Sequence, residues 1–148
     1  MNIQEEVLLF FVMFIMSLCI DSMSVMVYSR KDLYLSKSLI FSSLYMASTM
    51  ICAHQIFHYL SYGHMKSNVF IIGIGLSLTF FYIMRQQLFI KPQDWLREMI
   101  PHHSTAITTT TQLLNNNKLP TNSPIYKLAN KILATQKNEI ATMKKLLI

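Results

Sequence analysis

The sequence predicts an all-α membrane protein with three transmembrane helices followed by a C-terminal antiparallel helical hairpin. Two observations lead to this fold class. The 148 residues are 52% hydrophobic and only 14% charged, whereas soluble domains average about 25% charged residues. The apolar residues are also concentrated in three long stretches, and the rest of the chain has an amphipathic helical pattern.

The three apolar stretches lie at residues 7–28, 39–60 and 68–84, and Arg85 follows the third. A helix needs about 20 mostly apolar residues to cross the roughly 30 Å hydrocarbon core of a bilayer. These stretches could instead be buried helices of a soluble protein, but the remaining chain is too short to cover all three. We therefore expect residues 1–88 to be a three-span region with the lipid bilayer as its partner. The acidic residues Glu5 and Glu6 before the first stretch are unlike a cleavable signal peptide, so that stretch is expected to be retained.

Basic residues are distributed unevenly around the expected spans. Six lie near the first turn or after the third span, and one lies in the second turn: Arg30, Lys31, Lys37, Arg85, Lys91 and Arg97 against Lys66. Cytoplasmic flanks are enriched in Lys and Arg, so this count predicts a cytoplasmic hairpin. The net charge is +6, but the basic residues form no cluster interleaved with aromatic residues, so we expect no nucleic-acid partner.

Residues 92–148 are expected to form the hairpin. Its first helix covers residues 93–114 and should kink at Pro101, which has no N–H for the Arg97 carbonyl. Residues 115–122 are a turn-rich connector, and Ser123 is a typical N-cap before Pro124. The last helix has an apolar stripe with one polar member, formed by Ile125, Leu128, Ile132, Gln136, Ile140, Met143 and Leu147. Because so small a hairpin has a thin core, we expect self-association, most simply as a homodimer that completes a four-helix bundle.

Potential metal ligands occur at helical spacing in both hairpin helices. Met99 and His103 are four residues apart, as are Glu139 and Met143, so each pair lies on one helical face. His with Met suits copper, and His with Glu suits zinc or iron. Packing of the two methionines in the core, with a solvated histidine, explains the same spacing. Adjacent histidines point about 100° apart on a helix, so His102 and His103 do not easily share one ligand.

The second apolar stretch contains a separate set of candidate ligands. Met46, Met50, His54 and His58 follow one another at four-residue steps and so share one stripe. A methionine stripe is usually packing. Histidines within a bilayer are costly and tend to face a bundle interior or a water-filled cavity. This stripe is therefore a second candidate intramembrane site, while Asp21 is expected near the first turn, as an interfacial carboxylate or a functional group, away from these histidines.

The pattern from Asp94 to Leu147 resembles the ferritin-like family catalogued as domain of unknown function 305. The resemblance rests on Met-Ile-Pro-His-His at residues 99–103 and on a later group of residues at similar offsets: Ala106, Ile107, Gln136, Glu139, Ile140 and Met143. A membrane-bound branch of that family also has three spans before the motif, with a methionine-rich second span. The hairpin would then be half of a ferritin-like four-helix bundle.

The resemblance implies an association with metal, with copper for some members, and directs attention to five residues: Met99, His102, His103, Glu139 and Met143. Copper is the expected ion and zinc the alternative. The chain departs from the family in reading Thr108 to Thr111 where a Met-Ala pair is frequent, and in having one hairpin where the full unit has two.

Three classes of function are open at this point. The first is a membrane protein whose hairpin binds metal, for metal binding or homeostasis. The second is a non-catalytic structural or assembly protein whose hairpin mediates self-association. An enzyme is the least favoured, because ferritin-like redox chemistry needs paired Glu and Glu-x-x-His sets, and the hairpin has only Asp94, Glu98 and Glu139.

Overall fold

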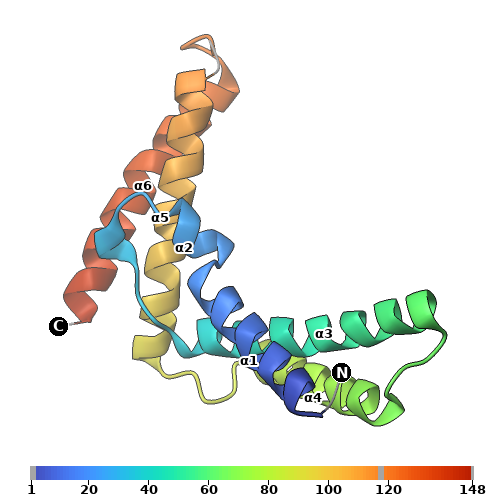
Figure 1. Cartoon of the computed structure of the whole chain (residues 1–148). Helices are drawn as coiled ribbons and strands as arrows, with labels where there is room; N and C mark the ends of the chain where they lie inside the picture. The colour runs from blue at the N-terminus through green and yellow to red at the C-terminus, as the bar shows by residue number, and fades with distance from the viewer. Residues whose placement is uncertain (1–2, 117–118, 148) are drawn as a thin grey trace. The chain divides into compact units, whose positions relative to one another are not determined.

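A computed structural model describes residues 3–116 and 119–147, and all regular elements in these ranges are helical. They are α1 (Ile3–Cys19), α2 (Ser22–Met26), a 3₁₀ turn η1 (Arg30–Asp32), α3 (Lys37–Tyr62), α4 (Ser67–Arg85), α5 (Pro92–Asn116) and α6 (Pro124–Leu146) (Figure 1). The predicted all-helical class is confirmed. Three helical segments, Gln4–Met26, Lys37–Tyr62 and Ser67–Arg85, are long and apolar enough to cross a membrane.

The first apolar stretch differs in detail from the expected 7–28. Its helix already begins at Ile3, and it is interrupted between Cys19 and Ser22. The backbone carbonyl of Asp21 accepts a hydrogen bond from Val25 N–H at 3.1 Å, so Asp21 starts the short α2 as an N-cap residue. Asp is a favoured residue at a helix start, and this is consistent with a new helix beginning after Asp21.

The chain forms two compact units. The membrane unit consists of residues 3–20 and 37–90. The hairpin unit consists of residues 21–36 together with the described residues after 90. Residues 21–36, which follow the first apolar helix, thus pack with the C-terminal helices.

Within the membrane unit, α3 packs against both α4 and α1. The buried positions of α3 are mostly small or polar: Ser38, Ser43, Ala47, Ser48, Ile51 and Gln55. Large apolar side chains on the same helices, such as Phe57, Ile71 and Phe81, are instead exposed. This inverted pattern is typical of helices that pack in lipid, where small residues allow backbones to approach closely and large ones face the hydrocarbon.

Gly73 marks a close approach of α4 to α3. A Cβ at this position would lie 2.7 Å from the Sγ of Cys52 and 3.5 Å from the Ser48 carbonyl oxygen. Gly75, two residues later on the same helix, has no atom within 4 Å of the corresponding point. Only the first of these glycines is thus required by packing.

Within the hairpin unit, α5 and α6 pack side by side around a core of Leu96, Ile100, Ile107, Ile140 and Met143 (Figure 1). Helix α5 continues through Pro101 to Asn116. Ser123 caps α6 by accepting a hydrogen bond from Tyr126 N–H, with Pro124 at the start of the helix, as expected. The predicted apolar stripe of α6 is buried only in its C-terminal half, because Ile140 and Met143 are buried whereas Leu128 is 58% exposed.

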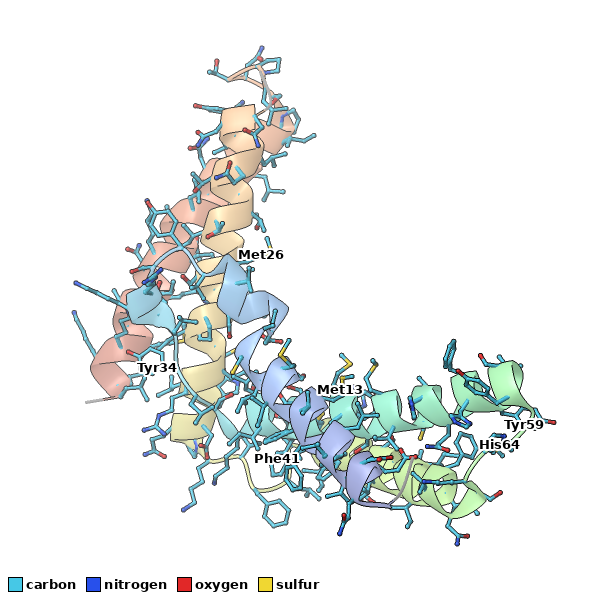
Figure 2. All side chains as sticks on the ribbon, viewed as in Figure 1. Met13, Met26, Tyr34, Phe41, Tyr59 and His64 are labelled. Carbon is cyan, nitrogen blue, oxygen red and sulfur yellow. The ribbon has the colours of Figure 1, made fainter. Side chains whose placement is uncertain are left out.

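Segment 21–36 covers part of the hairpin. Helix α2 packs on α5, and Tyr34, labelled in Figure 2, packs against the hairpin core. The buried carboxylate of Asp32, 5% exposed, accepts a hydrogen bond of 2.6 Å from Ser104 Oγ on α5 and forms an ion pair with Lys144 on α6. Ser104 Oγ in turn accepts a hydrogen bond from Tyr28 N–H at 2.9 Å. One carboxylate thus connects this segment to both hairpin helices.

We predict that Gly73→Ala destabilises the membrane unit by about 1–2 kcal/mol, because overpacking a tight contact has costs of this order. Thermal unfolding in detergent measures the effect. Gly75→Ala is the matched control and should behave like the parent. Adding Cys52→Ala to Gly73→Ala removes the clashing sulfur and should restore most of the lost stability; equal losses for both glycine variants would contradict the contact.

We predict that Asp32→Ala destabilises the hairpin unit by about 1–3 kcal/mol, because it leaves the buried Ser104 hydroxyl without its acceptor and Lys144 without its counter-ion. Amide hydrogen exchange of peptides covering 96–107 and 137–147 should become faster. The control is Thr109→Ala, since the Thr109 hydroxyl is exposed and donates to carbonyls of its own helix. Unchanged exchange in Asp32→Ala would show that segment 21–36 does not support the hairpin.

Candidate metal sites in the hairpin and the second span

The antiparallel pairing of α5 and α6 brings His103, the last residue of the Met-Ile-Pro-His-His motif, beside Glu139. Nδ1 of His103 lies 3.1 Å from Oε2 of Glu139, an ion-pair distance. This nitrogen is buried and makes no hydrogen bond to a described residue, while the Glu139 side chain is 46% exposed. The structure therefore brings together one histidine and one carboxylate of the predicted set.

The other predicted hairpin ligands lie in different surroundings. His102 is exposed, and its ring centroid is 6.0 Å from that of His103. Met143 belongs to the hydrophobic core, and Met99 packs against that core. The thioethers thus contact apolar side chains, as the packing interpretation expected. Among the described residues, no group of three or more His, Cys, Asp or Glu side chains that could hold a metal ion comes together.

The stripe on the second span divides into two parts. Met46 and Met50 are 51% and 41% exposed and lie on the outer surface of α3. His54 and His58 are half-buried, and their ring centroids are 6.2 Å apart. The two imidazoles are therefore neighbours, whereas the methionines precede them on the exposed part of the helix.

A polar cluster beside His54 was not expected from the sequence. Glu6 of α1 is buried, and its Oε2 lies 3.7 Å from His54 Nδ1. Oε1 of Glu6 accepts a hydrogen bond of 3.0 Å from Gln55 Nε2 and lies 3.6 Å from Lys66 Nζ. Gln55 also accepts a hydrogen bond from the Lys66 backbone N–H at 3.1 Å. The cluster thus ties α1 to α3 and to the turn between α3 and α4.

Two sequence signals could have indicated this cluster. Gln55 is a polar residue next to a histidine inside an apolar stretch, and polar residues within spans tend to pair with one another. Glu6 is one turn inside a helix whose next residues are almost all apolar. In the sequence, Glu6 stands out only as a charge that precedes the first apolar stretch. Asp21 belongs to the segment that packs with the hairpin.

Comparison with known proteins finds a curated relative and a family match, and the family match lies in the C-terminal part of the chain. A curated relative, described as "Uncharacterized protein L153" of Acanthamoeba polyphaga mimivirus, is 40% identical over 77 residues, which are 52% of this chain and 49% of the relative. The chain thus spans about half the length of the curated relative it matches. No solved structure matches the chain. The helices that carry the Met-Ile-Pro-His-His motif and Glu139 are the ones that a family model covers: residues 91–147 match the family described as a domain of unknown function, DUF305.

Proposed function

We propose that this chain is a multi-pass membrane protein whose hairpin binds copper, in metal binding or homeostasis. The observation that carries the proposal is the 3.1 Å approach of Glu139 to His103 Nδ1 within the DUF305 segment. A carboxylate beside Nδ1 favours a proton on that nitrogen and leaves the lone pair on Nε2, the usual arrangement of a metal-binding histidine and its carboxylate partner. Imidazole nitrogen suits both copper and zinc.

We further propose that two hairpins complete the site. One chain supplies His103 with Glu139, and His102 lies exposed on the neighbouring face of α5. A second hairpin could use that exposed imidazole and cover the apolar side chains that remain open near the connector, Leu113, Ile125 and Leu128. Isologous pairing of this kind is the commonest symmetry of homo-oligomers. It would also produce the four-helix bundle that a ferritin-like fold requires.

The proposed topology has three spans, with the hairpin in the cytoplasm. Two observations support it. The Lys and Arg bias favours that side. The contact of Asp32 with Ser104 and Lys144 requires residues before α3 and residues after α4 to lie on the same side, which follows if α3 and α4 each cross the bilayer once.

A non-catalytic structural role is the alternative function. The placement of Met143 inside the hydrophobic core and of Met99 against it favours this role, because these thioethers already stabilise the hairpin without an ion. The exposed apolar residues near the connector would then serve self-association alone.

We predict that replacing both His102 and His103 with Ala reduces the copper bound by the full-length protein in detergent by one ion per chain, because isologous pairing of two hairpins forms two equivalent sites. Glu139→Gln should weaken Cu(I) affinity at the hairpin about 10–100-fold, the usual effect of losing the carboxylate partner of a ligating histidine. Competition with a chromogenic Cu(I) chelator measures both effects. Glu98→Gln makes the same chemical change on α5 instead of α6 and should leave the Cu(I) affinity unchanged. Parent-like copper binding by the double variant would favour the structural role.

We predict that the end of α3 is accessible from outside the cell and that the connector between α5 and α6 is not. Cys19 and Cys52 are first replaced by Ala, and single cysteines are then introduced as Ser61→Cys and Asn122→Cys, both at exposed positions. In intact cells a membrane-impermeant maleimide should label position 61 and not position 122 until the membrane is opened. Labelling of both positions before opening would contradict the three-span topology, and labelling of position 122 alone would reverse the orientation.

A further inference from the structure

The α3–α4 turn holds His58 in a defined protonation pattern. Helix α3 ends at Tyr62, and Gly63 adopts φ +73°, the left-handed conformation that favours glycine. This turn brings the carbonyl oxygen of His64 to 3.0 Å from His58 Nδ1. His64 lies at this end of α3 in Figure 2. Since a carbonyl oxygen only accepts hydrogen bonds, Nδ1 of His58 carries the proton and donates, which leaves the lone pair of the neutral ring on Nε2.

The second imidazole, His54, has a carboxylate beside the same ring atom. Its Nδ1 lies 3.7 Å from Glu6 Oε2, and both atoms are buried without a hydrogen-bond partner among the described residues. Buried polar atoms that lack partners are rare and call for an explanation. Oε1 of Glu6 contacts Gln55 and Lys66, so Oε2 is the oxygen that faces the His54 ring. A carboxylate in this position stabilises an imidazole whose other nitrogen binds a cation.

The spacing of the two rings matches a shared ion of low coordination number. A metal–nitrogen distance of about 2.0 Å, with about 1.1 Å more from nitrogen to ring centre, puts two rings on opposite sides of one ion about 6 Å apart. The observed centroid separation of His54 and His58 is 6.2 Å. A tetrahedral angle would bring the ring centres closer together, to about 5 Å for the same bond length. Two opposed nitrogen ligands suit Cu(I), whereas structural zinc needs four ligands, and the described residues do not bring three such side chains together.

We propose that His54 and His58 form a Cu(I) site in the membrane unit, with Glu6 and the His64 carbonyl as the groups that orient the two rings. The ring of His64 lies 4.6 Å from that of His58. In the proposed site His64 contributes its backbone carbonyl, which orients the His58 ring, and its side chain is not a ligand. The site consists of residues outside the DUF305 segment and does not depend on the hairpin site.

The test uses the full-length protein in detergent with His102→Ala and His103→Ala, so that the hairpin cannot contribute copper ligands. With ascorbate present, this background should bind one Cu(I) per chain, measured against a chromogenic Cu(I) chelator. X-ray absorption at the copper edge should show the feature of two-coordinate Cu(I) with nitrogen ligands. A background protein without bound Cu(I) would overturn the proposal.

Three further substitutions in that background distinguish the roles of the residues. His54→Ala and His58→Ala should each abolish the bound ion. Glu6→Gln keeps the shape of the side chain and should weaken binding about 10–100-fold. His64→Ala removes an imidazole but keeps the backbone carbonyl, so it should bind Cu(I) as the background does.

The contrary outcomes are equally specific. Unchanged Cu(I) binding in His54→Ala or His58→Ala overturns the site, and loss of binding in His64→Ala overturns the ligand assignment. Tighter binding of Zn(II) than of Cu(I) overturns the choice of ion. Because a substitution to Ala could impair folding, His58→Gln is the second variant. If it has the parent's circular dichroism and elution volume and still binds Cu(I), the proposal fails.

Discussion

The carboxylate of Asp32 is the interaction on which the arrangement of the hairpin unit depends. It is buried, and it contacts Ser104 on α5 and Lys144 on α6 at the same time. A buried carboxylate is tolerated only where such partners satisfy it. Through these partners the two helices gain a fixed contact with residues 21–36. The same contacts make residues 21–36 part of the hairpin unit. A charged turn between two spans is thereby also an element of the C-terminal unit.

The membrane unit is held together by a different principle. Between helices in lipid, apolar burial supplies little net attraction, so contact depends on close backbone approach and on polar pairs. Gly73 allows the approach of α4 to α3. Glu6, Gln55 and Lys66 supply the polar connection between α1, α3 and the turn. Because these groups are concentrated near the α3–α4 turn, the imidazoles of His54 and His58 lie beside the most polar part of an otherwise apolar unit.

The sequence was sufficient to predict the helices and insufficient to predict their polar contacts. Hydropathy identified the three long apolar helices, and the Ser123–Pro124 pair identified the start of α6, because both signals are local. The break at Asp21 lay within an apolar run, and hydropathy averaged over the run does not detect it. The contacts of Asp32 with Ser104 and Lys144 join residues 72 and 112 positions apart, and no local pattern encodes such a pairing. Helical spacing places Met99 with His103 on one face and Glu139 with Met143 on one face. It does not specify the 3.1 Å approach of His103 to Glu139 or the packing of the two methionines with the core, because both depend on how α5 and α6 pack together.

The two proposed metal sites use the same chemical unit in different dielectric surroundings. Each pairs a histidine Nδ1 with a carboxylate, His103 with Glu139 at 3.1 Å and His54 with Glu6 at 3.7 Å. Glu139 is half exposed, so water competes for its charge, while Glu6 is buried and interacts more strongly with a nearby positive charge for the same distance. The contact of Glu6 with His54 is longer than that of Glu139 with His103, but its lower dielectric surroundings offset the greater distance. A cation bound at His54 would be stabilised by a desolvated carboxylate, and one bound at His103 would remain in exchange with solvent.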